Sequence, residues 1–373
     1  MTGAQGACVS IVRQYLAVSA ACFVILYGSP LQGQSESFEP SVTVGAGLQT
    51  NFQGNLPTGS NSTDQFALDH IRLYLSGDVT KNISFMFNTD YTGANDNMNI
   101  LDAVGEFHFS PHANVWVGRF LPPSDRDNFT GPFYANAWAM YTDGIQDGYP
   151  FVYQGRDNGA AYWGDFKAGP AKIKASVGAF DGSSADGNSS LIWAERIQID
   201  FWDPEDGYYL NSTYYGDKNL LAIAGANQVQ AGHTATTADF LMERKVHGGG
   251  AFTIESEYAR YNDLGGYNAN YVRSEGAYAQ ASFLIPQKVG IGKFELLGKY
   301  AQAEFTNGIM TPIVHNPSYR QDTTEADFDY IIKQFDARIM AFCKDTTFNG
   351  VQKDFWEAGI GLQLQISKTL KFH

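Results

Sequence analysis

The chain has 373 residues, of which 44% are hydrophobic, 17% charged and 14% aromatic, and its 25 basic and 39 acidic side chains give a net charge of −14. The charged fraction lies below the quarter that is typical of soluble domains. The acidic balance excludes a nucleic-acid-binding protein, because such proteins need basic patches.

The first 33 residues differ in kind from the rest. They hold one charged side chain, Arg13, and an apolar run from Tyr15 to Tyr27. A lone cation, a short apolar run and a small-residue exit are typical of a secretory signal peptide, and the run is short against the ~20 residues of a membrane-spanning helix. We expect a cleaved signal peptide at 1–33 and one domain at 34–373. Cleavage would leave Cys343 without an intramolecular disulfide partner.

Alternation of apolar and polar residues dominates the remaining sequence and indicates strands with two different faces. Ile71, Leu73 and Leu75 alternate with polar residues and, after a short turn, the segment from Ile83 to Tyr91 does the same. This pattern predicts sixteen strands, at 40–52, 66–79, 83–92, 99–109, 114–121, 156–166, 171–180, 191–202, 219–229, 236–246, 250–261, 274–285, 292–305, 326–334, 337–345 and 355–366. Most reach the nine to eleven residues that a tilted membrane strand requires.

The connections alternate in length, as in membrane barrels that have short turns at one end and long loops at the other. The short set is 80–82, 110–113, 167–170, 247–249, 286–291 and 335–336; the long set includes 53–65, 122–155, 181–190, 262–273, 306–325 and 346–354. One connection, 203–218, is long where a short turn is expected. It is either a long turn or a segment that contains two further strand ends.

Soluble β-sandwiches and barrels share this alternation. Three features favour a transmembrane barrel: the signal peptide, the even strand count with alternating connections, and aromatic residues such as Phe109, Trp202 and Trp356 near strand ends. Closure also removes the unpaired strand edges that an open sheet would expose to lipid. We therefore expect an all-β, sixteen-stranded antiparallel transmembrane β-barrel.

Several segments resemble the phosphate-selective porin O and P family: RLYLSGDVTKNISFMFNTDY (72–91), LDAVGEFHF (101–109), VGRFLPP (117–123), GRDNGAAYWG (155–164), ASVGAFDG (175–182) and GLQLQI (361–366). The motifs are short, but they keep their order over nearly the whole of the chain after residue 33. The resemblance implies an outer-membrane porin, a homotrimer, and a long third external loop, within 122–155, that folds inward to constrict the pore.

Phosphate selectivity does not carry over with the resemblance. Phosphate-selective members resemble one another in a lysine cluster on the constriction loop and an arginine ladder along the lumen. The loop at 122–155 contains no lysine, and its charges are Asp125, Arg126, Asp127, Asp143 and Asp147. Anion selectivity requires basic side chains at the narrowest point. We therefore expect no strong preference for phosphate.

Charged residues on the polar faces of the strands and at the constriction are candidates to line the pore or to contact solutes. They are Arg72, Arg119, Arg126, Arg156, Lys172, Lys174, Arg196, Lys299, Asp90 and Glu106, although Val115 and Val117 share the parity of Arg119. Each is either a solvated lumen charge or a solute contact. A wall with charges of both signs predicts a water-filled, weakly discriminating channel.

Signatures of catalysis are lacking: the sequence has no G-x-S-x-G, H-E-x-x-H, Walker or C-x-x-C motif, and its seven histidines are scattered. We expect no catalytic residue, metal site or cofactor. The predicted function is a passive outer-membrane channel for small hydrophilic solutes or inorganic ions, in contact with lipid and not with nucleic acid. The alternative is a soluble exported β-sandwich or barrel protein that binds carbohydrate through its many Tyr and Trp side chains.

Overall fold

The structure is a computed structural model that describes residues 38–92, 97–138, 155–182, 190–262, 271–307, 318–350 and 352–371. Residues 39–373 form one compact unit. The predicted signal peptide at 1–33 lies outside the described residues. No helix in the described ranges is long and apolar enough to cross a membrane.

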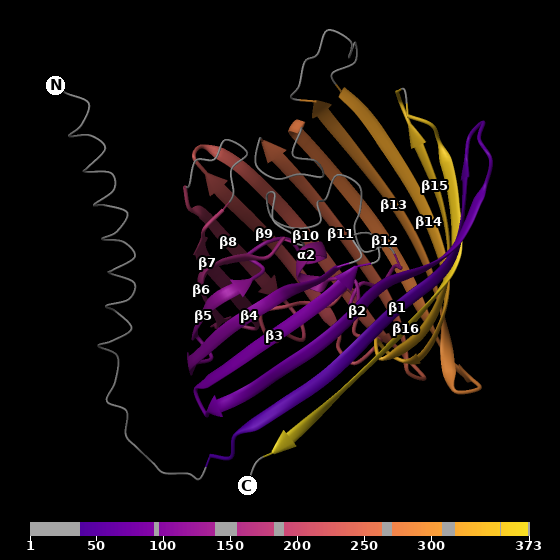
Figure 1. The fold of residues 1–373 in the computed structure, drawn as a ribbon. Coiled ribbons are helices and arrows are strands. Elements are labelled where there is room, and N and C mark those ends of the chain that lie inside the picture. The colour runs from indigo at the N-terminus through magenta and orange to yellow at the C-terminus, as the bar shows by residue number, and fades with distance from the viewer. Residues whose placement is uncertain are drawn as a thin grey trace, which may run out of the picture. The chain divides into compact units, whose positions relative to one another are not determined.

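Sixteen antiparallel strands form a closed barrel, in which each strand pairs with its neighbours in the sequence and β1 pairs with β16 (Figure 1). The strands are β1 (Ser41–Pro57), β2 (Thr63–Thr80), β3 (Ile83–Thr92), β4 (Asn97–Ser110), β5 (Ala113–Phe120), β6 (Asp157–Ala168), β7 (Ala171–Phe180), β8 (Ile192–Asp200), β9 (Leu220–Gln230), β10 (His233–Val246), β11 (Gly250–Asn262), β12 (Tyr271–Val289), β13 (Gly292–Asn307), β14 (Ser318–Lys333), β15 (Ala337–Phe348) and β16 (Phe355–Lys371). A short helix, α2 (Arg126–Thr130), follows β5.

The burial of side chains is the reverse of that in a soluble protein. In β8, Arg196 and Gln198 point inward and are 3% and 0% exposed, whereas Ile197 points outward and is 59% exposed. The same reversal holds at Leu73 and Ile360, which are 52% and 58% exposed on the outer face. Apolar side chains thus cover the outside of the barrel, and polar and charged side chains face the lumen.

The barrel has two distinct ends. Ser41 pairs with Lys371, so the start of β1 and the end of β16 lie at one end, which we call the turn end. Short turns at 81–82, 111–112 and 169–170 also lie there. The opposite end, the loop end, carries the connection between β5 and β6. It also has the tight turn at Ala231 and Gly232, both with positive φ (51° and 92°), as two-residue hairpin turns require.

All sixteen predicted strands are confirmed, and the differences lie at their ends. β14 begins at Ser318 and not at 326, and β16 continues to Lys371 and not only to 366. Polar residues that pair with neighbouring strands make these extensions: Arg320 lies opposite Glu304 and forms an ion pair with Asp322 at 2.9 Å. Alternation of apolar and polar residues is lost in such segments, although backbone pairing is not.

The long connection between β8 and β9, predicted as a long turn or as two further strand ends, contains no strand. Instead, it enters the lumen from the turn end, where Glu205 and Leu210 are 0% and 3% exposed. Polar lumen walls make this position favourable, because they supply hydrogen-bond partners to an irregular backbone.

Tight packing of a turn against β6 generates a first prediction. A Cβ added at Gly164 would lie 2.1 Å from the carbonyl oxygen of His112, a backbone atom, whereas one added at Gly298 would meet no atom within 4 Å. Gly164→Ala should therefore lower the free energy of unfolding by about 1–3 kcal/mol, and Gly298→Ala should leave it unchanged or slightly raised. Urea unfolding of the detergent-solubilised barrel, followed by circular dichroism, measures both. Equal stability of the two variants would contradict the described contact.

Candidate functional site

The lumen is the candidate site, because most of the predicted site residues point into it. The strand residues that point inward are Arg72, Asp90 and Glu106 on β2 to β4, Lys172, Lys174 and Arg196 on β7 and β8, and Lys299 on β13. Arg126 lies within the β5–β6 connection, and Arg156 is its last residue. Arg72, Arg126, Arg156, Lys174, Arg196, Lys299 and Asp90 are all at most 8% exposed.

Arg119 is the exception among the predicted pore residues. It shares the outer face of β5 with Val117, which is 48% exposed, and its Nε donates a hydrogen bond to the carbonyl oxygen of Ile100 at 3.2 Å. Trp116 and Phe120, of opposite parity, are the residues of β5 that point inward, at 5% and 0% exposure. The prediction that Arg119 lines the pore is therefore wrong, as its shared parity with Val115 and Val117 indicates.

The first part of the β5–β6 connection, residues 121–138, folds into the lumen, as predicted for the constriction loop; residues 139–154 lie outside the described residues. Asp125 caps α2 by accepting a hydrogen bond from the backbone N–H of Asn128 at 2.8 Å. The segment is held by side chains from opposite walls of the barrel. Hydrogen bonds to its backbone carbonyls come from Gln228 to Pro123, Arg196 to Ser124, Gln49 to Pro132, Gln363 to Phe133 and Arg338 to Ala135, at 2.7 to 3.0 Å.

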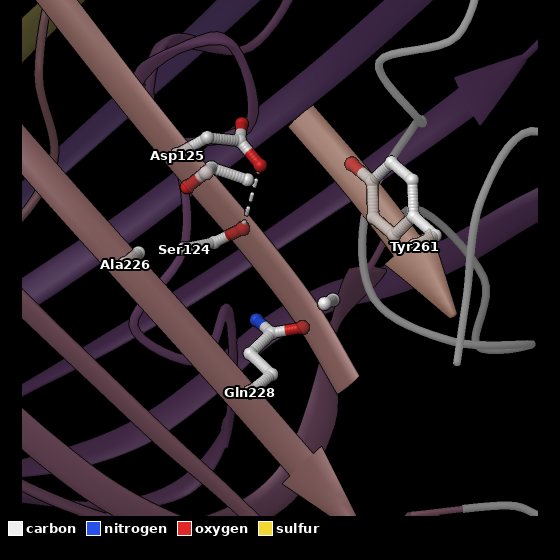
Figure 2. Close-up of a pocket in the computed structure, with 7 residues that line it drawn as sticks. Ser124, Asp125, Ala226, Gln228 and Tyr261 are labelled. Atoms are coloured by element: carbon white, nitrogen blue, oxygen red, sulfur yellow. Dashed lines mark hydrogen bonds between the residues drawn. The ribbon is translucent and has the colours of Figure 1, made fainter. Parts of the chain in front are cut away.

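Packing between this segment and the wall at β9 to β11 is close. The cavity drawn in Figure 2 has a volume of about 10 Å³ and lies between Ser124 and Asp125 on the segment and Gln228, Thr237 and Tyr261 on the wall. A space of this size holds about one water molecule. On this side, then, the segment leaves no room for a solute.

A second segment, residues 203–218, enters the lumen from the turn end and meets the first. Tyr208 donates a hydrogen bond from its hydroxyl to the Leu121 carbonyl at 2.9 Å, and the Ser212 N–H donates to the Tyr134 carbonyl at 3.1 Å. On the wall, Glu243 of β10 accepts hydrogen bonds from the backbone N–H groups of Tyr214 and Gly216, both at 2.7 Å. The lumen is thus entered from both ends by segments that are bonded to each other.

Four buried charges join the two segments to the wall. Arg126 of the first segment binds Glu205 of the second through two hydrogen bonds of 2.9 and 2.6 Å, and its Nε lies 3.4 Å from Asp239 of β10. Arg196 of β8 binds Asp239 in the same two-pronged geometry, at 2.5 and 2.9 Å. Paired, bidentate contacts of this kind are the strong form of the ion pair.

Protonation in this network follows from its geometry. Burial alone would raise the pKa of the Glu205 carboxyl, but the Arg126 guanidinium outweighs burial and holds that pKa below its ordinary value. Burial likewise opposes the charged form of Arg126, yet the Glu205 and Asp239 carboxylates keep the pKa of Arg126 well above its ordinary value. Both partners are therefore charged at neutral pH.

Aromatic side chains surround these charges. Trp116, Phe129 and Tyr208 lie within one buried cluster, with ring centroids of Trp116 and Tyr208 4.5 Å apart and those of Phe129 and Tyr208 5.1 Å apart. Arg196 lies over the Phe129 ring at 5.6 Å. The cluster gives the two segments an apolar contact in addition to their ion pair.

Other predicted residues are also held by partners. Arg72 lies 3.3 Å from Asp90 and 5.1 Å from the Phe133 ring centroid. Lys172 lies 3.0 Å from Asp165, and Lys174 donates to the Gly207 carbonyl. The remaining contacts are Arg156 to Asp102 at 3.6 Å, Lys299 to Glu325 at 4.0 Å and Ser84 to Glu106 at 2.9 Å. Most of the basic side chains are thus neutralised by acids.

Sequence reasoning missed several residues of the site. Asp239 and Arg338 are 3% and 0% exposed, and alternation along β10 and β15 could have identified both as inward-facing. Glu205 could not have been found in this way, because an irregular segment has no periodicity. In the described residues, no group of three or more His, Cys, Asp or Glu side chains is arranged to hold a metal ion.

Comparison with known proteins supports the fold. No family model and no curated protein match the sequence, so the resemblance to the phosphate-selective porin O and P family stays a prediction. Among solved structures, OprB of Pseudomonas putida is 10% identical, with 88% of this chain and 94% of that chain covered and a TM-score of 0.58. OmpF of Salmonella typhi, solved in complex with daunomycin, is 9% identical, with 87% and 97% covered and a TM-score of 0.57. The outer membrane channel DcaP of Acinetobacter baumannii is 14% identical, with 90% and 100% covered and a TM-score of 0.52. At these identities the similarity shows the sixteen-stranded barrel fold.

Substitution of Glu205 tests the link between the two inward segments. Glu205→Gln should destabilise the barrel by about 3–5 kcal/mol, because it removes one partner of a buried ion pair. Asp206→Asn is the matched control: its side chain is 74% exposed, and loss of an exposed pair costs about 0–1 kcal/mol. The midpoint of thermal unfolding, followed by circular dichroism, reports both changes.

Acid sensitivity provides a second readout of the same pair. Because the folded-state pKa of Glu205 lies below its ordinary value of 4.5, its stabilisation is fully present above that value and is lost as pH falls through the lower, folded-state pKa. The stability of the Glu205→Gln variant should therefore fall less steeply below pH 4.5 than that of the unchanged protein. Parallel curves would contradict the assignment.

Proposed function

We propose that this protein is a passive channel of the bacterial outer membrane that admits small hydrophilic solutes or inorganic ions and performs no catalysis. The observation that carries the proposal is the reversed burial of its side chains. An outer wall with Ile197, Leu73 and Ile360 half exposed needs an apolar solvent. A charged interior, with Arg196 3% exposed inside the wall, needs water or polar partners.

Export and assembly belong to the same proposal. A signal peptide at 1–33, removed on export, would deliver residues 34–373 to the outer membrane as the barrel domain. The protein would assemble there as a homotrimer, as its resemblance to porins implies. The similarity to OprB, OmpF and DcaP supports the barrel rather than a particular solute.

The charges of the lumen favour cations over anions. Among the buried charged side chains of β10 to β14, eight are carboxylates and one is a lysine, Lys299: the acids are Asp239, Glu243, Glu255, Glu257, Glu295, Glu325, Asp327 and Asp329. Arg126 and Arg196 are paired with Glu205 and with Asp239 of this wall, and Lys299 is paired with Glu325. Arg338 of the neighbouring strand β15 donates hydrogen bonds to the Ala135 carbonyl and to Gln363. An acidic wall attracts cations into the pore and repels phosphate.

The alternative, a soluble carbohydrate-binding protein, is less consistent with the fold. Its polar face would have to meet water and its apolar face would have to form a core. In the barrel, Trp356 is 52% exposed on the outside and Trp116 is 5% exposed inside. Purification without detergent discriminates between the two: a monodisperse detergent-free protein would favour the soluble alternative.

Ion selectivity tests the proposed charge preference. In planar lipid bilayers with a salt gradient, the reversal potential should show greater permeability to K⁺ than to Cl⁻, and low phosphate should not block the current. Asp327→Lys combined with Asp329→Lys should move the reversal potential toward anion selectivity, since it places two basic side chains on the acidic wall. Glu304→Lys, on the outer face of β13, is the control and should leave the potential unchanged. Strong anion selectivity would overturn the proposal.

Deletion of the constriction loop tests its place in the pore. Replacing 125–150 by a short Gly/Ser linker should raise single-channel conductance, because residues 125–138 occupy the lumen. Shortening the exposed connection at 58–62 at the same end of the barrel is the control and should change conductance little. Unchanged conductance after the larger deletion would rule out a constricting role.

A further inference from the structure

The outer faces of β3 to β9 carry only two charged side chains among the described residues, and these are opposite in sign. Arg119 lies on β5 and Glu195 lies on β8. The other outward-facing side chains of these strands are apolar or uncharged, for example Val117, Val177 and Ile197, which are 46–59% exposed. A pair of isolated charges on an apolar wall requires an explanation.

Glu195 is the more unusual of the two. It is the fourth of the nine residues of β8 and is exposed between Trp193 and Ile197 on the outer face. No hydrogen bond or ion pair to Glu195 occurs within the described ranges. An ionisable side chain in the middle of a membrane-facing strand is costly when lipid surrounds it.

The surface beside Glu195 is hollowed and partly polar. Asn227 of β9 lies opposite Glu195, and Thr236 of β10 lies opposite Asn227 and donates a hydrogen bond to it at 3.0 Å. Gly225 contributes no side chain, and a hollow of about 540 Å³ lies over this part of the wall. A carboxylate, an amide and a hydroxyl around a hollow fit a polar partner better than acyl chains.

Between Arg119 and Glu195 the strands are short, and many of their outward side chains are small. β5 to β9 have 8, 12, 10, 9 and 11 residues, whereas β12 has 19 and β2 has 18. The outward residues of β6 and β7 include Ala160, Ala175 and Ala179. Small side chains allow another backbone to approach closely.

We propose that the outer face of β5 to β9 is the contact surface between copies of this chain, with Arg119 of one copy paired to Glu195 of the next. Arg119 and Glu195 lie toward opposite edges of this face, so the Arg119 edge of one copy complements the Glu195 edge of the next. Repeated head to tail, such contacts form a ring when the rotation between neighbouring copies closes. The inference rests on the homotrimer of the proposed function and deepens it, because it assigns the interface and the residues that specify its register.

Disulfide cross-linking tests the contact directly. Arg119→Cys and Glu195→Cys are combined in a chain in which Cys8, Cys22 and Cys343 are replaced by alanine. Within one copy, β5 and β8 are three strand spacings apart, about 14 Å, whereas a disulfide requires Cα atoms within about 7 Å. Any bond between these two positions therefore joins two copies.

Complete oxidation of the protein in mild detergent should give a covalent trimer on a non-reducing denaturing gel. The control combines Arg119→Cys with Ile360→Cys, which lies on the outer face of β16 and is 58% exposed in the unchanged chain, and it should stay monomeric on the gel. Absence of a cross-link, a product that stops at the dimer, or equal cross-linking of the control would overturn the proposal.

Charge reversal separates the ion pair from general packing. Arg119→Glu and Glu195→Arg should each weaken assembly by on the order of tenfold or more, because each places like charges together. The double reversal should restore assembly, as measured by light scattering of the detergent complex. If both single reversals assemble like the unchanged protein, or if the unchanged protein is monomeric, the pairing is wrong and lipid covers this face.

Discussion

The structure depends on one constraint: every strand must present an apolar face to the outside and satisfy its backbone hydrogen bonds at the same time. Closure of β1 onto β16 meets the second requirement by removing both edges of the sheet. The first requirement turns the usual burial inside out, so that Arg338 and Gln363 are 0% exposed inside while Ile366 is 73% exposed outside. A lumen with such walls can hold irregular backbone, which an apolar core could not.

Occupation of the lumen from both ends follows from these polar walls. The segment at 121–138 obtains hydrogen bonds for its carbonyl groups from Gln49, Arg338 and Gln363, and the segment at 203–218 obtains them for its N–H groups from Glu243. Arg126 and Glu205 then join the two segments. Basic side chains of the lumen that could attract anions, such as Arg126 and Arg196, are therefore held in ion pairs with acids. On β13 and β14, buried acidic side chains outnumber buried basic ones.

The sequence predicts the barrel well because alternation is a local signal. All sixteen strands, and most inward-facing charges such as Lys174 and Arg196, follow from the alternation of side chains along each strand. Arg119 falls on the same face as the outward-facing valines of β5, so the same rule places it outside, against the prediction that it lines the pore. The absence of lysine in the loop is likewise readable from the chain. Local patterns cannot reveal contacts between distant irregular segments, so the Arg126–Glu205 pair and the inward course of 203–218 emerge only from the fold. The polar extension of β14 around Arg320 lacks apolar–polar alternation, so the pattern of the sequence does not predict it.

Quenching of tryptophan fluorescence by brominated lipids tests the reversed burial most directly. Single-tryptophan variants that retain Trp356, which is 52% exposed on the outer face, or Trp116, which is 5% exposed in the lumen, would be reconstituted in vesicles of brominated phospholipid. We predict strong quenching of Trp356 and little of Trp116. Equal quenching of the two, or none of Trp356, would contradict a barrel with its apolar face in lipid.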